Sequence, residues 1–95
     1  MNVTQLINSK GKAVANQLII HDGDNITFQS YDSKIATYNK QDKTLKLCGD
    51  LWDYSNTTRK HFSQFINDFT AFGYDNKSQF LQLIEELNDR IKTVQ

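Results

Sequence analysis

Residues 62–72 read FSQFINDFTAF, and this stretch decides the fold. Its large apolar side chains recur at spacings of three and four, which places them on one face of an α-helix: Phe62, Phe65, Ile66, Phe69 and Phe72. Candidate N-cap residues stand ahead of it in Ser55-Asn56-Thr57, and Gly73 supplies a left-handed stop. We therefore predict a helix at about residues 57–72 with one apolar face that needs a partner.

The segment before this helix is typical of β-strands joined by tight turns. Residues 17–21, QLIIH, run into the turn sequence DGDN at 22–25, and Ile26 and Phe28 then alternate with polar neighbours. Breaks at 32–33 and 39–42 delimit two further strand segments, the last carrying Leu45 and Leu47. We predict a meander of three or four antiparallel strands over about residues 13–48. Residues 1–12 are expected to form a short helical turn or an irregular arm.

A second helical pattern ends the chain. Asn76 with Gln79 resembles a capping box, and apolar residues follow at helical spacing: Phe80, Ile84, Leu87, Ile91 and Val94. These residues predict a helix at about 77–93, joined to the first by the short link 73–75 so that the two helices are neighbours. The fold class is then α+β in a single domain, 1–95. Residues 80–94 hold more apolar side chains than the core needs. These could pack within a monomer or form the contact of a homodimer.

Composition narrows the classes of function. Eleven basic and eleven acidic residues cancel, which argues against a general nucleic-acid binder and against an acidic mimic of DNA. The lone Cys48 cannot form an internal disulfide, so we expect a reducing cytosol. No apolar stretch approaches the roughly 20 residues of a membrane span, and we expect no membrane contact.

The sequence offers little for catalysis or metal binding. It has two histidines, one cysteine, no glycine-rich phosphate loop and no nucleophile elbow. We therefore expect no enzymatic activity, no metal and no cofactor.

The start of the first helix is unusual because it carries cations where acidic residues are favoured. The run TTRKH comprises Thr57, Thr58, Arg59, Lys60 and His61. Backbone donors, hydroxyl groups and cations together are typical of a site for an anion or an acidic partner. The alternative is an ordinary helix start that tolerates cations beside its own partial positive charge.

Aromatic residues give a second candidate surface. Trp52 and Tyr54 join sheet to helix and could either plug the core or anchor a protein partner. Tyrosines and lysines interleaved along the strand region could stack single-stranded nucleic acid, or the lysines could protect strand edges.

Three segments resemble a known family: VANQLII at 14–20, FQSYDSKIA at 28–36 and WDYSNTTRKH at 52–61, followed by Phe65. The pattern is similar to small uncharacterised proteins carried by phages and mobile elements of low-GC Gram-positive bacteria. The resemblance spans roughly residues 1–66 and leaves residues 76–94 as an addition. The resemblance implies a phage or mobile-element origin and a shared fold. It implies no catalysed reaction.

Size, residue content and this resemblance predict a binding module that acts on a host or phage macromolecule, a protein partner being favoured. The sharper version is an inhibitor of a bacterial defence system such as CRISPR or restriction. The alternative is a small nucleic-acid-associated regulatory protein that uses the helix start at Arg59 to His61.

Overall fold

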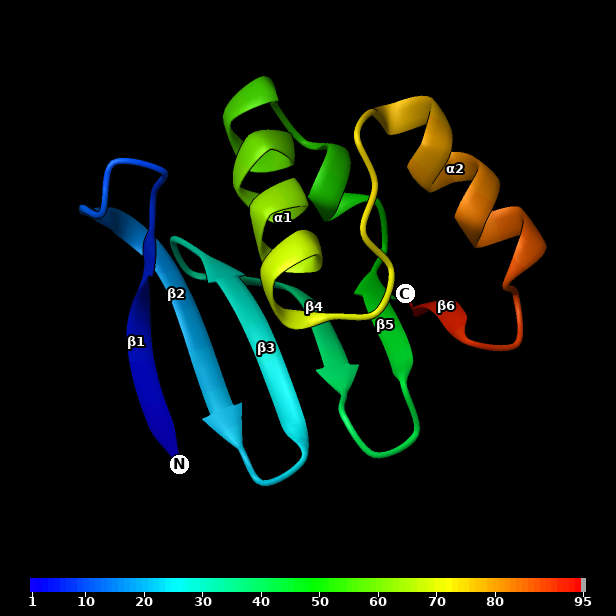
Figure 1. The fold of residues 1–95 in the computed structure, drawn as a ribbon, viewed down its shortest axis with the longest axis horizontal. Coiled ribbons are helices and arrows are strands. Elements are labelled where there is room, and N and C mark those ends of the chain that lie inside the picture. The colour runs from blue at the N-terminus through cyan, green and yellow to red at the C-terminus, as the bar shows by residue number, and fades with distance from the viewer. Residues whose placement is uncertain (95) are drawn as a thin grey trace.

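A computed structural model describes residues 1–94 as one mixed sheet with two helices over one of its faces (Figure 1). The strands are β1 (Asn2–Ile7), β2 (Ala13–Asp22), β3 (Asn25–Ser30), β4 (Ser33–Asn39), β5 (Thr44–Cys48) and β6 (Ile91–Val94). The helices are the 3₁₀ turn η1 (Leu51–Asp53), α1 (Asn56–Phe69) and α2 (Lys77–Glu86). The predicted α+β class is confirmed, and the six strands exceed the three or four expected.

The strands lie in the sheet in the same order as in the sequence. Its spatial order is β1-β2-β3-β4-β5-β6, with antiparallel pairing throughout the first five strands. Gly23 lies in the β2–β3 turn at a φ of 61°, a conformation that glycine adopts without steric cost. The predicted meander is therefore present, and it extends by one strand at each edge.

The N-terminal expectation was wrong, because residues 2–7 form the edge strand β1 rather than a helical turn or an arm. Asn2 lies opposite His21, and the pairing with β2 continues through a register shift between Gln5 and Ile7. Only Leu6 of this strand is buried. An edge strand with one inward side chain has no clear apolar alternation, so its sequence pattern is weak.

The expected end of the second helix was also wrong. The helix α2 stops at Glu86, and residues 91–94 form β6, which runs parallel to β5. The amide of Leu45 donates to the carbonyl of Arg90, and that of Gly49 donates to the carbonyl of Val94, both at 2.7 Å. β-Branched residues are favoured in strands, and pairing here satisfies the free edge of β5.

The link between the helices is longer than expected. It spans residues 70–76 and carries Phe72 and Tyr74 into the core. The helix α2 contributes one fully buried side chain, Phe80, whose ring lies 4.9 Å from that of Trp52 and 5.2 Å from that of Phe62. Phe80 therefore anchors α2 in the core, and the partly buried Leu83 and Ile84 of the same helix pack beside it.

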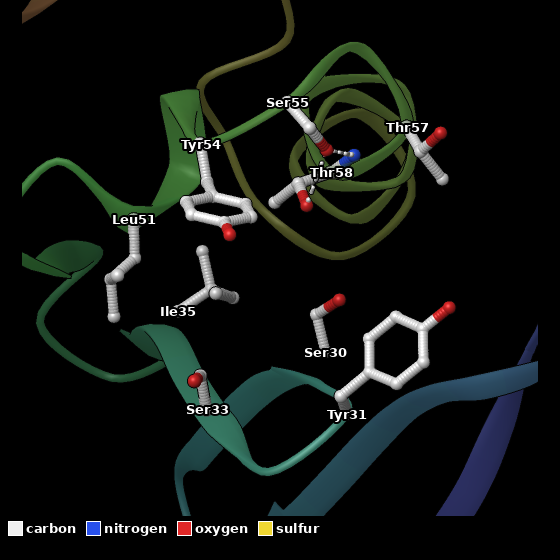
Figure 2. Close-up of a pocket in the computed structure, with 9 residues that line it drawn as sticks. All are labelled: Ser30, Tyr31, Ser33, Ile35, Leu51, Tyr54, Ser55, Thr57 and Thr58. Atoms are coloured by element: carbon white, nitrogen blue, oxygen red, sulfur yellow. Dashed lines mark hydrogen bonds between the residues drawn. The ribbon is translucent and has the colours of Figure 1, made fainter.

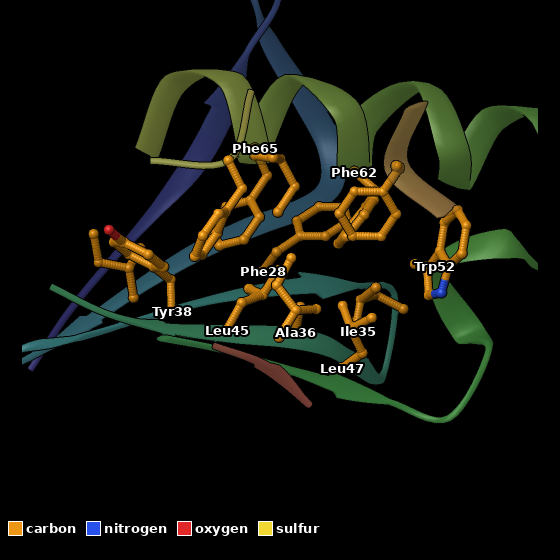
Figure 3. Packing of buried hydrophobic residues seen from close by; sticks show 14 of the residues in the cluster. Phe28, Ile35, Ala36, Tyr38, Leu45, Leu47, Trp52, Phe62 and Phe65 are labelled. Carbon is orange, nitrogen blue, oxygen red and sulfur yellow. The ribbon is translucent and has the colours of Figure 1, made fainter. Parts of the chain in front are cut away.

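The core lies between the sheet and α1, as the phenylalanine stripe predicts (Figure 3). Phe62, Phe65 and Ile66 are fully buried, whereas Phe69 at the end of α1 is only partly buried. The rings of Phe65 and Phe28 stack at 5.6 Å, which joins α1 directly to β3. Aromatic contacts therefore supply much of the packing in this small core.

The strand β6, found where the sequence predicted a helix, gives a test of the fold. On a continued helix Ile91 and Val94 would share one stripe, but in β6 their exposed fractions are 3% and 50%. Ile91→Ala should lower the free energy of unfolding by about 2–4 kcal/mol, because it leaves a cavity in the core. Val94→Ala should change it by less than about 0.5 kcal/mol. Urea denaturation measures both variants, and equal losses would contradict the strand.

Candidate functional site

The structure divides the predicted anion site at the start of α1. Thr57 and Thr58 line one pocket, whereas Arg59 and Lys60 line a second hollow beside the start of α2. His61 lies with Lys60 at a third position, facing the β1–β2 connection. Successive residues of a helix point about 100° apart, so five in a row cannot converge on one ligand. The run therefore does not form a single site.

The cation Arg59 is already paired. Its Nη1 lies 2.8 Å from Oδ1 of Asp53, and Nζ of Lys77 lies 2.8 Å from the other carboxylate oxygen. A second hydrogen bond joins Arg59 to the side chain of Asn56. The hydrogen bond from Lys77, followed by that from Arg59, lowers the pKa of Asp53 despite partial desolvation. Asp53 supplies the negative charge that the first turn of α1 lacks, and it ties the starts of α1 and α2 together.

His61 is half-buried on a different side of α1. Burial, followed by the neighbouring Lys60 cation, lowers the pKa of this imidazole. Both causes favour the neutral form at pH 7. His61 is therefore poorly suited to bind an anion by charge.

The two aromatic candidates differ in exposure. Trp52 is 5% exposed and packs on Phe62 and Phe80, so it plugs the core and presents no face to a partner. Tyr54, two residues later, is 81% exposed. Only Tyr54 of this pair is placed to contact another molecule.

A pocket of about 520 Å³ lies beside Tyr54, between the first turn of α1 and the β3–β4 turn (Figure 2). Tyr31, which is 64% exposed, stands on its other side. The remaining lining residues are small or aliphatic: Ser30, Ser33, Ile35, Leu51, Ser55, Thr57 and Thr58. No lining residue is charged, and five of them carry an aliphatic hydroxyl. Such a pocket offers hydrogen bonds and an apolar floor, which suits recognition.

Local backbone features build the walls of this pocket. Ser55 caps α1 by accepting a hydrogen bond from the amide of Thr58 at 3.1 Å. A register shift in the β3–β4 pairing leaves both Ile35 and Ala36 buried, which is how a β-bulge redirects a side chain. Ile35 therefore contributes to the pocket.

Sequence reasoning missed Ser30 and Ser33 as members of a site, and it considered Tyr31 only as part of an aromatic surface for nucleic acid. They stand more than twenty residues before Tyr54, and no motif joins the two segments. Tyr31 has a φ of 54°, a conformation in which residues other than glycine are uncommon. The nearest sequence signal was the FQSY segment, whose turn residues separate two strands.

The tyrosines considered for stacking single-stranded nucleic acid are Tyr31, Tyr38 and Tyr74, and of these three only Tyr31 is exposed. Tyr38 and Tyr74 are buried in the core, and burial raises the pKa of Tyr74 to about 12.

Within residues 1–94, no group of three or more His, Cys, Asp or Glu side chains could hold a metal ion. In the same residues, no helix has both the length and the apolar character needed to cross a membrane.

These features define a small α+β protein with an uncharged pocket beside the first turn of its main helix. The chain belongs to a family of unknown function, DUF8033, whose model matches residues 1–82. The match reaches into α2, so much of this helix is part of the family pattern, contrary to the expectation that it was an addition. No curated protein and no solved structure matches the chain.

The Asp53 pairs give a pH-dependent prediction. A carboxylate whose folded pKa is lowered stabilises the fold above its unfolded pKa of about 4, and this stability is lost as pH falls through the folded pKa. Asp53→Asn should therefore cost about 1 kcal/mol at pH 7 and low salt, and progressively less below about pH 4.

Urea denaturation across pH measures this effect. Asp50→Asn is the matched control, because Asp50 is exposed and makes no ion pair within residues 1–94. A pH-independent loss in Asp53→Asn, or an equal loss in the control, would show that the ion pairs do not stabilise the fold.

Proposed function

We propose that this chain is a non-enzymatic binding module that recognises a protein partner through the tyrosine surface, defined as Tyr31, Tyr54 and the pocket between them. The observation that carries the proposal is the exposure of both rings at one pocket, 64% and 81%. Tyrosine is favoured at binding hot spots because it offers a large rigid contact area together with a hydrogen-bonding hydroxyl.

Charge favours a protein partner over a nucleic acid. The pocket has no cationic lining residue, and nucleic-acid affinity depends chiefly on neutralising phosphates. Arg59, which the alternative would need, is engaged by Asp53. The regulatory nucleic-acid alternative therefore has weaker support.

The narrower function, inhibition of a bacterial defence system, is supported only by size and by the resemblance to phage proteins. It stays a prediction, as do the phage origin and the cytoplasmic location. The tyrosine surface is proposed as the contact site whichever protein the partner is.

Affinity capture tests the proposal. The tagged protein is incubated with lysate of a low-GC Gram-positive bacterium, and retained proteins are quantified by mass spectrometry. The double variant Tyr31→Ala/Tyr54→Ala should lose most of the partner, since hot-spot truncations typically cost more than about 1–2 kcal/mol each.

The matched control is Leu81→Ala/Val94→Ala, which removes two exposed apolar side chains outside the tyrosine surface. This control should retain the partner as the parent does. Capture of the same proteins by the tyrosine variant, or retention of nucleic acid alone by the parent, would contradict the proposal.

A further inference from the structure

The hydroxyl groups of two buried residues face the pocket of the tyrosine surface from opposite walls. Ser30, at the end of β3, is 5% exposed, and Thr58, in the first turn of α1, is 8% exposed. Both line the pocket, and Figure 2 shows the Ser30 hydroxyl pointing into the space between the turn and the helix. Among residues 1–94 the Ser30 side chain makes no hydrogen bond, and its hydroxyl opens onto the pocket, so it is available to a ligand.

The hydrogen bonds of Thr58 leave its proton without an acceptor. Its Oγ1 accepts a hydrogen bond from the Ser55 hydroxyl at 3.1 Å, while Ser55 accepts from the Thr58 amide. A hydroxyl carries one proton, and that of Thr58 has no acceptor within the described chain. Two donors, from Ser30 and Thr58, are therefore available to one ligand.

The first turn of α1 adds further donors. The first backbone bond that closes a turn of α1 runs from the Arg59 amide to the Ser55 carbonyl, so the amides of Asn56 and Thr57 have no intrahelical partner. At the start of this 14-residue helix the backbone carries about half a positive charge. Anionic oxygen atoms are the groups that such a helix end favours.

The uncharged lining selects among anions. A phosphate dianion would meet no full positive charge in the pocket, because none of the lining residues is Lys or Arg. A cation would meet the unfavourable end of the helix dipole. A carboxylate, with a single charge and two acceptor oxygens, matches two hydroxyl donors and the partial charge of the helix start.

We propose that this pocket binds a carboxylate, which Ser30, Thr58 and the first turn of α1 hold while Tyr31 and Tyr54 flank the group that bears it. The inference rests on the proposed function, since it names the group that the partner presents at the tyrosine surface. The carboxylate belongs either to a chain terminus or to an acidic side chain of that partner.

Small probes test this inference without knowledge of the partner. N-acetylphenylalanine carries a terminal carboxylate and a ring. Its C-terminal amide keeps the ring but replaces the carboxylate with a neutral group of similar shape that has one acceptor oxygen in place of two. The α-amide of N-acetylglutamate carries a side-chain carboxylate. In ¹H–¹⁵N spectra the first probe should shift the amides of Ser30 and Thr57 with a Kd in the millimolar range. The uncharged amide should bind at least about fivefold more weakly.

The two carboxylate probes distinguish the sources. Tighter binding of N-acetylphenylalanine supports a terminal carboxylate beside an apolar residue, and tighter binding of the glutamate derivative supports an acidic side chain. Equal binding of N-acetylphenylalanine and its amide, or tighter binding of inorganic phosphate than of either carboxylate, would overturn the proposal. This comparison needs only the unaltered protein.

A variant pair assigns the contact to the pocket. Ser30→Ala should weaken N-acetylphenylalanine binding about 5- to 10-fold while the thermal midpoint stays unchanged, because the hydroxyl has no partner within the fold. Ser78→Ala, which removes an exposed hydroxyl on α2 outside the pocket, should bind as the parent does. Unchanged binding in Ser30→Ala would also overturn the proposal.

Failure of this inference is separable from failure of the proposed function. If the tyrosine variant loses its partner but no carboxylate binds, the tyrosine surface is a contact site for another chemistry. If carboxylates bind but the tyrosine variant captures the partner as the parent does, the pocket is a ligand site and the proposed function is wrong.

Discussion

The packing of one phenylalanine ring, Phe62, holds the parts of this molecule together. It is fully buried and lies 5.2 to 6.4 Å, between ring centroids, from Phe28 of β3, Trp52 of η1 and Phe80 of α2. The sheet, the 3₁₀ turn and both helices therefore meet at one side chain. Because these contacts share one ring in a thin core, its removal would loosen the sheet, the 3₁₀ turn and both helices together.

The pocket between Tyr31 and Tyr54 depends on that packing. Trp52 is fixed in the core, so the chain leaves η1 in one direction and Tyr54 is turned outward. α1 then begins at Asn56 beside the end of β3 and the Ser30–Ser33 turn. The walls belong to elements whose buried faces are packed in the core. The pocket therefore keeps its shape without a bound partner.

The sequence predicts those parts of the fold whose signals are local and periodic. The spacing of Phe62, Phe65 and Ile66 identifies α1 and its buried face, and Asn76 is confirmed as the N-cap of α2. The strand β6 could not be predicted from spacing, because Ile91 and Val94 continue the helical period of Phe80 and Ile84. What decides their conformation is the unpaired edge of β5, which is a tertiary constraint.

The candidate site was less predictable than the fold. The positions of Tyr54 and the threonines in the sequence made them candidates, but the pairing of Arg59 with Asp53 could not be predicted, because it depends on how η1 joins α1. Ser30 gave no signal and Tyr31 was considered only for stacking nucleic acid, since the pocket that they line and the positive φ of Tyr31 are visible only in three dimensions. Strain of this kind is often found where a residue serves binding rather than the fold.

The conformation of Tyr31 provides the most direct test of the account, whose central claim is that this residue serves recognition. Glycine adopts a φ of 54° without steric cost, so Tyr31→Gly should leave the free energy of unfolding unchanged or raise it. The same variant should bind N-acetylphenylalanine at least about fivefold more weakly, because it removes one aromatic wall of the pocket. A loss of stability greater than about 0.5 kcal/mol, or unchanged binding, would contradict the account.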